Sequence, residues 1–531
     1  MLHTIGALLT AAALVLATRP AHAAASCESL TALTASPGGA PLQVTLAQPV
    51  AAGAFTAPAG VPDGPAGASN PYLTLPSFCR VAMTLRPGPT SDVKAEVWMP
   101  VTGWNGKLQV AGNGGFAGTI GYRALATALA AGYAAAGTNT GHTGPAANTF
   151  ATEDATLDFA YRAVHETAVA AKQAVDGYYG AAPKFSYFNG CSTGGRQALT
   201  AAQRYPDDFD GIVGGAPAIF TTKQAFGQIW FHQAIALGEG AIAKEKLPLI
   251  HDAVLAACDT LDGAKDGVLE NPLACTFDPG VLACKPGAAS ESCLTAPQVE
   301  SVRKVYAGAT HATTGEKIFP GLERGSELGW SPVPVSYAVD YFKHVVFKNP
   351  SWSPASLGFG VDVAEAYPAA HQIFDANDPR LGAFAGRGGK LLMYQGWAEP
   401  GIPPGHIVNY YAAVKAQTAG AESAVRLFMV PGMGHCGGGD GASTFDMVPA
   451  LDRWVETGTA PERIPASRVR NGKVDRTRPL CAYPRYARYS GTGSMDDAAS
   501  FICAAPEKPS AFSLSPLGTA LAKGQRPKAR G

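Results

Sequence analysis

The sequence is poor in charge and has no excess of either sign. Charged residues make up 15% of the 531 residues, against about 25% in a typical globular protein. The 41 basic side chains balance the 41 acidic ones. A neutral chain has neither the net positive charge of a strongly basic nucleic-acid binder nor the net charge that keeps a disordered chain expanded. The composition therefore argues against both classes and predicts a chain that buries a large core.

Long apolar runs are missing beyond the N-terminus, and a membrane-spanning helix would need about 20 residues. The first apolar stretch, Ile5 to Ala17, is followed by Arg19-Pro20 and the small-x-small sequence Ala21-His22-Ala23. This order is typical of a secretory signal that is removed after residue 23, although no Lys or Arg precedes the stretch. We expect export to the periplasm or the medium, with a membrane-tethering N-terminus as the alternative.

The sequence also lacks a C-x-x-C pair, which argues against a zinc site and thioredoxin-type chemistry. It contains ten cysteines, and an even number in an exported chain predicts a set of disulfides. Cys27 lies close to the expected cleavage site and could alternatively carry a lipid. Ala24-Ala25-Ser26 matches a lipidation signal poorly, however, and lipidation would leave an odd thiol.

Strands and helices alternate in two parts of the sequence. Apolar runs that predict strands lie at 93–100, 107–110, 133–138, 184–189 and 211–214, and again at 390–395 and 425–430. Patterns that predict helices lie between them at 122–131, 158–179, 193–204 and 405–416. This alternation predicts an α/β fold with a mostly parallel sheet that helices cover on both faces.

Between these two parts, from about Ile219 to Arg387, the chain is irregular and rich in aromatic residues and clustered cysteines. One core with an insertion explains this pattern better than two domains in succession. We expect a signal at 1–23, a core at 24–218 and 388–507, and an inserted lid domain at 219–387. The tail at 508–531 is Pro-rich and basic, a composition typical of disorder.

The sequence Gly190-Cys191-Ser192-Thr193-Gly194 follows a predicted strand and precedes a predicted helix. In that context G-x-S-x-G predicts a nucleophile elbow, with Ser192 as the nucleophile. An ordinary tight turn capped by Ser192 is the alternative. The N–H of Thr193 and one N–H from the early glycine loop would bind the oxyanion. Gly115 is the favoured second donor and Gly114 the alternative, unless these glycines serve only the turn.

The general base should lie in a loop after the last core strand, where His435 follows the strand ending at Val430. The acid should lie between the two in chain order, which favours Glu399, just after the strand 390–395. Asp440 is the weaker candidate because it comes after His435. His142 and His165 are interpreted as packing or hydrogen-bonding residues, and Glu399 could instead be a solvated surface residue.

Cys191 precedes the predicted nucleophile and Cys436 follows the predicted base. A disulfide between them would tie the two catalytic loops together directly. Two free buried thiols are the alternative.

Five motifs stand out along the chain: Trp104-Asn105-Gly106-Lys107, the glycine loop Gly112 to Gly118, Gly190 to Gln197, Tyr205 to Gly211, and Gly432 to Cys436. Together they resemble the tannase and feruloyl esterase family of secreted serine hydrolases. The resemblance extends from about Cys27 to Cys503. It implies an α/β-hydrolase fold with a large lid inserted after the elbow region, where the alternation of strands and helices stops.

The resemblance also implies how the cysteines pair: Cys191–Cys436, Cys27–Cys79, Cys258–Cys275, Cys284–Cys293 and Cys481–Cys503. One position departs from the family, which usually places aspartate where this chain has Glu399. Glutamate serves the same role in other α/β-hydrolases, but its side chain is one methylene longer.

Asp259, Asp262 and Asp266 lie within eight residues, separated by glycine turns. Carboxylates so close repel one another, and a hard cation such as calcium would offset that repulsion. The spacing is not that of an EF-hand, and a solvated acidic turn is the alternative. The resemblance favours a structural calcium ion in the lid, bound by the three aspartates and the carbonyl oxygens of Ala264 and Val268.

These observations predict an exported serine esterase that acts on esters of aromatic carboxylic acids through an acyl-enzyme. The resemblance implies feruloyl or other hydroxycinnamoyl esters, or gallate esters. Insertion aromatics could stack on such an acid, among them Trp230, Phe231, Tyr341, Phe342 and Trp352. We expect a small-molecule ester as the partner, and neither nucleic acid nor a membrane.

Two alternatives to this function remain. A terephthalate monoester hydrolase would favour an arginine for the free carboxylate, but 337–370 contains none, and Lys343 and Lys348 would replace it poorly. A catalytically silent, calcium-stabilised binding protein is the alternative of another class, supported only by the unusual Glu399.

Overall fold

The computed structural model describes residues 25–34, 39–59, 61, 69–287, 290–360 and 373–506. The expected signal at 1–23 and tail at 508–531 lie outside the described residues, as does part of the expected lid domain. None of the helices in these described ranges is both long enough and apolar enough to cross a membrane.

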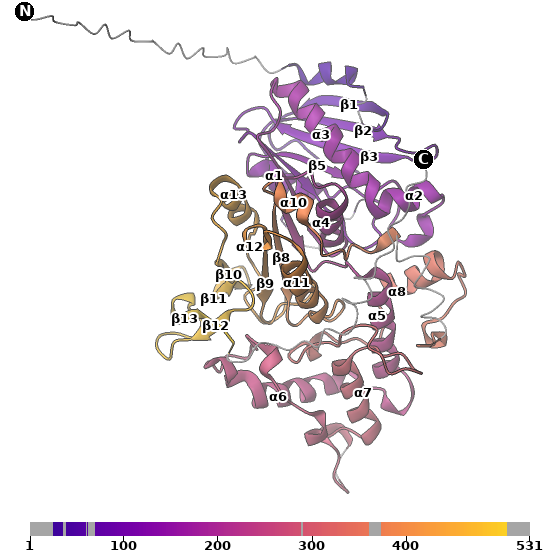
Figure 1. Ribbon diagram of the computed structural model, residues 1–531, viewed down its shortest axis with the longest axis vertical. Coiled ribbons are helices and arrows are strands. Elements are labelled where there is room, and N and C mark those ends of the chain that lie inside the picture. Colours follow the sequence, from indigo (N-terminus) through magenta and orange to yellow (C-terminus); the bar gives the residue numbers. More distant parts are fainter. Residues whose placement is uncertain are drawn as a thin grey trace, which may run out of the picture.

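A nine-stranded sheet forms the centre of the molecule, in the order β1-β2-β3-β5-β4-β6-β7-β8-β9 (Figure 1). The strands are β1 (Leu42–Val50), β2 (Phe78–Leu85), β3 (Val93–Pro100), β4 (Lys107–Ala111), β5 (Ala134–Thr138), β6 (Phe185–Cys191), β7 (Gly211–Gly215), β8 (Lys390–Gly396) and β9 (Val425–Val430). The pairs from β1 to β5 are antiparallel, and the pairs from β5 to β9 are parallel. The mostly parallel sheet predicted from the alternation is therefore present, with an antiparallel edge added to it.

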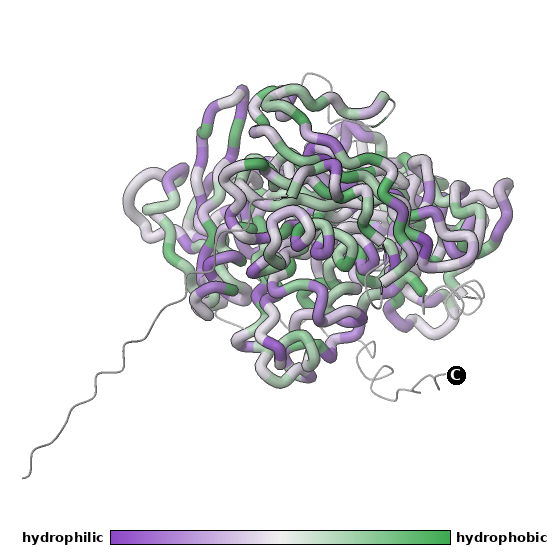
Figure 2. The backbone as a smooth tube through the Cα atoms, turned by 90° about the horizontal axis from the view of Figure 1, so that it is seen from above, coloured by the Kyte–Doolittle hydropathy of each residue, from purple (hydrophilic) through white to green (hydrophobic). Residues whose placement is uncertain are grey.

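Helices cover both faces of this sheet. One hydrophobic cluster joins it to α3 (Ala163–Tyr179), α4 (Thr193–Arg204), α11 (Gly405–Gln417) and α12 (Ala421–Ala424). A second cluster joins the other face to α1 (Tyr122–Ala130) and α13 (Val448–Thr457). The short helix α2 (Glu153–Leu157) and a π-helical segment, Asp158–Arg162, lead into α3. In the view from above, hydrophobic stretches run through the middle of the molecule, and strongly hydrophilic stretches lie mainly on the outer turns (Figure 2).

The segment between β7 and β8, residues 216–389, is called the insertion below. It contains α5 (Thr221–Ala236), α6 (Leu247–Cys258), α7 (Ala296–Ala307), α8 (Ser336–Asp340) and α10 (Gly382–Gly386), and no strand in its described part. Its helices α6 and α7 lie at the lower end of the molecule in Figure 1. Phe226 on α5 packs in the core of the sheet, whereas Phe231 and Ile235 pack with α6 and α7. Helix α5 therefore connects the two cores.

Several elements were not predicted from the sequence. They are β1 and β2, the insertion helices, and two small sheets formed by β10 (Arg463–Arg470) with β11 (Lys473–Cys481) and β12 (Tyr486–Tyr489) with β13 (Phe501–Ala504). Exposure alternates in β1 only over Leu42 to Leu46 and in β10 only over Arg463 to Ala466, so the period of two is short in both strands.

Candidate active site

Ser192 occupies the sharp turn between β6 and α4. Its backbone has φ 65° and ψ −120°, a conformation that residues with a side chain rarely adopt. The turn is tight because a Cβ atom at Gly190 would lie 2.7 Å from the backbone of Gly194. The G-x-S-x-G pattern therefore meets a steric need, and the turn exposes the serine hydroxyl at the end of the strand.

Gly195, which directly follows the G-x-S-x-G pattern, determines where helix α4 lies. A Cβ atom at Gly195 would lie 2.2 Å from the carbonyl oxygen of Gly215 and 2.7 Å from Cα of Pro217. Only glycine lets the first turn of α4 pack this closely against the end of β7. The candidate nucleophile is therefore held by contacts with the neighbouring strand as well as by its own turn.

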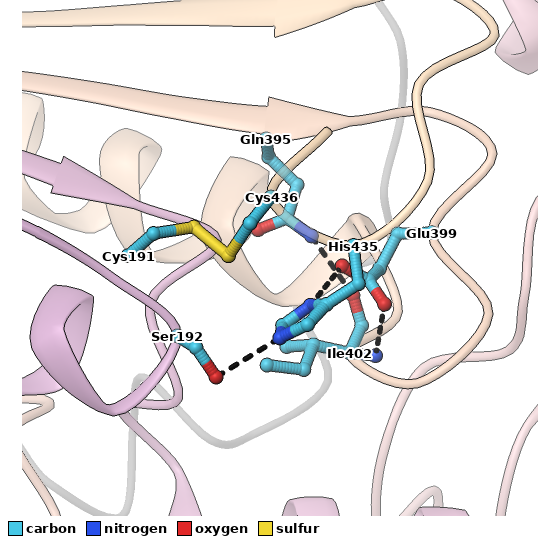
Figure 3. The surroundings of a disulfide bond; sticks show 7 residues. All are labelled: Cys191, Ser192, Gln395, Glu399, Ile402, His435 and Cys436. Atoms are coloured by element: carbon cyan, nitrogen blue, oxygen red, sulfur yellow. Dashed lines mark hydrogen bonds and ion pairs between the residues drawn. A yellow bond between two sulfur atoms is a disulfide. The ribbon is translucent and has the colours of Figure 1, made fainter. Parts of the chain in front are cut away.

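The structure brings together the three residues predicted to act as nucleophile, base and acid (Figure 3). Nε2 of His435 lies 2.9 Å from Oγ of Ser192, and Nδ1 of His435 lies 2.7 Å from Oε2 of Glu399. The three residues follow β6, β9 and β8 respectively. The carboxyl ends of parallel strands meet at one edge of a sheet, which is why residues so far apart in sequence converge.

Glu399 is completely buried and uses both carboxylate oxygens. Oε2 faces His435, while Oε1 accepts hydrogen bonds from the N–H groups of Gly401 and Ile402 at 2.8 and 3.2 Å. Gln395 donates to the carbonyl oxygen of Ile402 at 3.0 Å and so fixes the turn that holds the acid. The longer side chain thus reaches the histidine while its other oxygen remains bound to the backbone.

The charge of Glu399 sets the protonation of His435. Partial burial of the ring lowers the pKa of His435, but the hydrogen bond to Glu399 and its negative charge raise it more, so that the net pKa is raised. In the neutral ring, Nδ1–H donates to the carboxylate, and Nε2 is free to accept the proton of Ser192. This is the tautomer that a general base requires.

A disulfide joins Cys191 to Cys436, with Cα atoms 6.1 Å apart and 245 residues between them in sequence (Figure 3). It directly adjoins the candidate nucleophile on one side and the candidate base on the other. The remaining pairs are Cys27–Cys79, Cys258–Cys275, Cys284–Cys293 and Cys481–Cys503. These are the pairs that the family resemblance implied.

The glycine loop 112–118 is bound to the start of α4. Oγ1 of Thr193 donates to the carbonyl oxygen of Gly115 at 2.8 Å, and Gly115 has a positive φ of 52°. Within the described residues, the N–H groups of Thr193, Gly115 and Gly114 donate to no other group. The N–H of Thr193 and the N–H of either Gly115 or Gly114 are therefore available to an oxyanion.

His142 also holds this loop, a contact that the sequence suggested only as general hydrogen bonding. Its Nε2 lies 2.8 Å from the carbonyl oxygen of Phe116, and burial lowers the pKa of His142. A neutral ring with its proton on Nε2 fits this contact, because a carbonyl oxygen only accepts. The ring of Phe116 stacks on that of Tyr337, with centroids 4.1 Å apart, which places an aromatic residue of α8 beside the loop.

The other candidates from the sequence lie elsewhere. Asp440 forms an ion pair with Arg470 at 2.8 Å and does not bond to His435. His165 pairs with Asp208 at 2.8 Å. The aromatic residues Phe231, Tyr341 and Phe342 are buried in hydrophobic clusters, and Trp230 and Trp352 pack against them.

The three aspartates of the acidic turn provide oxygen donors but do not converge. Oδ2 of Asp262 is buried without a partner in the described structure, and burial raises the pKa of Asp262 to about 7. Asp259 accepts the N–H of Gly267, whereas Asp266 forms ion pairs with Arg478 and Arg476. No three His, Cys, Asp or Glu side chains of the described residues form a group that could hold a metal ion. The donor chemistry fits a hard cation, but this arrangement of the carboxylates does not.

Comparisons with known proteins agree with this geometry. The family model "Tannase and feruloyl esterase" matches residues 79–352 and 359–504. An uncharacterized esterase of Xanthomonas campestris pv. campestris is 39% identical, over 94% of this chain and 93% of its own. A probable feruloyl esterase B-2 of Aspergillus terreus is 34% identical, over 80% of this chain and 86% of its own.

Solved structures lead to the same family. Feruloyl esterase B from Aspergillus oryzae superposes with a TM-score of 0.83 at 31% identity, covering 90% of this chain and 99% of that one. Tannin acyl hydrolase from Aspergillus niger shares the fold, with a TM-score of 0.70 at 21% identity, covering 91% of this chain and 94% of that one. The predicted α/β-hydrolase fold and the family resemblance are thereby confirmed. The chain belongs to the tannase and feruloyl esterase family and is a carboxylic ester hydrolase.

Proposed function

We propose that this esterase is a serine hydrolase in which Ser192 is the nucleophile, His435 the general base and Glu399 the acid that orients the base. The observation that carries the proposal is the chain of two hydrogen bonds, 2.9 and 2.7 Å long, that joins the three side chains. Two hydrogen bonds in series leave Nε2 of His435 as the acceptor for the serine proton.

The reaction proceeds in two halves. Oγ of Ser192 attacks the ester carbonyl while its proton passes to Nε2 of His435, and the N–H groups of Thr193 and Gly115 stabilise the oxyanion. His435 then gives this proton to the departing alcohol, which leaves the acid bound to Ser192 as an ester. Water, deprotonated by His435, hydrolyses that acyl-enzyme and frees the carboxylic acid.

The proposed substrates are esters of aromatic carboxylic acids, either feruloyl and other hydroxycinnamoyl esters or gallate esters. The relative from Aspergillus terreus and the solved structure from Aspergillus oryzae are both named feruloyl esterases. Tyr337, stacked on Phe116 beside the oxyanion loop, offers an aromatic surface near the acyl group. A terephthalate monoester is the less favoured substrate because residues 337–370 contain no arginine. The proposed triad argues against a catalytically silent binding protein.

An ester panel tests this function. Purified enzyme is incubated with methyl ferulate, methyl gallate and a terephthalate monoester, with the Ser192→Ala variant as the matched control. We expect cleavage of at least one aromatic ester, its loss in Ser192→Ala, and labelling of Ser192 by a fluorophosphonate. Labelling that persists in Ser192→Ala, or an active Ser192→Ala enzyme, would assign the nucleophile elsewhere.

We also propose that the chain is exported. Five disulfides form among its ten cysteines, and such bonds persist in oxidising compartments. The apolar stretch before Ala23 supports a signal that is removed there. Mass spectrometry of the protein from the periplasm or medium should find an N-terminus at residue 24, and an intact Met1 in the cytoplasm would contradict the proposal.

Calcium remains a proposal for the acidic turn. The unpartnered Oδ2 of Asp262 supports it, but Asp266 would have to leave its arginine partners to reach the same ion. The ion would join the carboxylates to the carbonyl oxygens of Ala264 and Val268 and so stabilise the insertion. We expect a chelator to lower the unfolding temperature and added calcium to restore it. An unchanged unfolding temperature, with no calcium found by elemental analysis, would refute the site.

A further inference from the structure

His406 is a buried histidine near the triad that the proposed chemistry does not use. It lies in the first turn of α11, its side chain contacts the rings of Phe220 and Phe319, and only 2% of it is exposed. No motif or spacing distinguishes it among the eleven histidines of the sequence.

Both ring nitrogens of His406 face backbone carbonyl oxygens. Nδ1 lies 2.7 Å from the oxygen of Pro403, and Nε2 lies 2.8 Å from the oxygen of Pro217. A carbonyl oxygen can only accept a hydrogen bond, and a neutral imidazole carries only one N–H. A neutral ring would therefore set the lone pair of one nitrogen against a carbonyl oxygen, whereas the imidazolium donates to both.

Opposing effects act on this ring. Burial lowers the pKa of His406, and the positive end of α11 also disfavours a cation. The two carbonyl contacts and the negative charge of Glu399 raise the pKa, but burial outweighs them, so these effects together lower the pKa of His406. The pair of carbonyl acceptors favours the charged ring against this direction, because a neutral ring cannot donate to both. Glu399 is the charged group that acts on His406 in the described part of the chain; Phe220 and Phe319, which pack on its ring, carry no charge.

The two carbonyls belong to the two loops that the chemistry must align. Pro403 is in the turn whose N–H groups, at Gly401 and Ile402, hold Glu399. Pro217 lies beside the nucleophile elbow, since the next residue, Ala218, donates its N–H to the carbonyl oxygen of Ser192 at 3.3 Å. The ring of His406 therefore links the turn that supports the proposed acid, through Pro403, to the loop beside the proposed nucleophile, through Pro217.

We infer that His406 is a positioning residue that is held as an imidazolium, ties these two loops together and offsets the charge of Glu399. The inference rests on the proposed triad. A positive charge near Glu399 weakens the pull of that carboxylate on the proton of His435. The base is therefore more easily kept neutral, and ready to act, near neutral pH.

The protonation state is measured without reference to activity. Histidine labelled with ¹⁵N is introduced into the full-length enzyme, and the His406 ring signals are assigned by their absence from His406→Gln, or from His406→Asn if the first variant does not fold. We expect both ring nitrogens of His406 to carry protons at about pH 8, where an ordinary histidine is neutral. His232, whose ring makes a single carbonyl contact at 2.9 Å, is the internal comparison for the ring signals. A neutral His406 ring at this pH would overturn the inference even if the triad is correct.

The effect on the base is measured by kinetics. In His406→Gln the acidic limb of kcat/KM should move upwards by about 0.5 to 1 pH unit, because a nearby positive charge has been removed. His232→Gln should leave the limb in place. If His406→Gln lowers kcat/KM without moving the limb, His406 only packs the loops and its charge does not act on the base. Ser192→Ala is assayed alongside. If it loses all activity, the proposed triad is supported, and an unmoved limb in His406→Gln then contradicts only the inferred role of His406.

Discussion

At the scale of residues, Glu399, the proposed acid, divides its carboxylate between two tasks. One oxygen binds the backbone of the turn, and the other holds the ring of His435. The side chain is completely buried, so no water can replace either partner. The geometry of the base therefore depends on the length of this one side chain.

Shortening the acid should misalign the base. In Glu399→Asp the carboxylate cannot both keep its backbone hydrogen bonds and reach His435, so kcat/KM should fall by about 10- to 100-fold. In Glu399→Gln the amide favours the wrong tautomer, and the loss should approach about 10⁴-fold. Asp440→Asn, which changes a carboxylate paired with Arg470, is the control. An unchanged rate for Glu399→Gln, or a large loss for Asp440→Asn, would assign the acid to the other residue.

The pH dependence follows from the same contact. Glu399 raises the pKa of His435 above the ordinary histidine value of about 6.5, and the protonated ring cannot accept the proton of Ser192. Activity should therefore be lost as the pH falls through this raised pKa, so the acidic limb of kcat/KM should lie above 6.5. Rates measured from about pH 5 to about pH 9 check this limb. A limb clearly below 6.5 would mean that Glu399 does not hold the ring as described.

At the scale of elements, the site depends on how closely α4 packs against β7 and the oxyanion loop. A methyl group at Gly190 or Gly195 would collide with backbone atoms, and one at Gly194 would lie 3.1 Å from the carbonyl oxygen of Asn113. Backbone cannot move aside as a side chain can, because it is held by the hydrogen bonds of the sheet. The conformation of the elbow therefore depends on the packing of α4, β7 and the glycine loop, and not on one turn alone.

Adding a methyl group at Gly195 should separate these elements. Its Cβ would lie 2.2 Å from the oxygen of Gly215, so Gly195→Ala should cost about 3 kcal/mol or more and lower kcat as the nucleophile shifts. Gly382→Ala on α10 is the control, since a Cβ there would meet nothing within 4 Å and should leave stability unchanged or higher. Thermal unfolding and kcat of both variants provide the comparison. Wild-type stability in Gly195→Ala would show that the contact relaxes easily.

The sequence predicted the core strands and the triad because each carries a local signal. Buried parallel strands appear as short apolar runs, and the residues around Ser192 match a pattern with a steric cause. His406 carries no such signal, because its partners are carbonyl oxygens of Pro403 and Pro217 and any residue supplies a carbonyl. Tyr337 could not be selected either, since its place beside Phe116 depends on how the insertion folds back.

At the scale of the whole molecule, the insertion separates the proposed catalytic residues along the chain. Ser192 precedes it, and Glu399 and His435 follow it. The Cys191–Cys436 disulfide joins the loops on either side of this separation. It should contribute more than the short disulfides within the insertion, because the stabilisation grows with the length of the closed loop in the chain-entropy view.

Removing this disulfide should affect both stability and rate. For the Cys191→Ala/Cys436→Ala variant we expect a loss of about 5 kcal/mol in stability and a lower kcat, because nothing covalent then ties the nucleophile to the base. The Cys284→Ala/Cys293→Ala variant, which opens a link between residues only nine apart, should lose about half as much stability and keep its kcat. Denaturant unfolding and initial rates measure both effects. Equal kcat values in the two variants would show that the first disulfide does not align the triad.

The same bond would matter most to an exported enzyme, as proposed above. Cys191 and Cys436 close a covalent ring that contains the whole insertion, between β7 and β8. One cut by a protease anywhere in that ring opens it but releases no fragment. The serine would remain on one side of the cut and the histidine on the other, still joined through sulfur. An enzyme exposed to foreign proteases could thus be nicked in its insertion and remain one molecule until a reductant reached it.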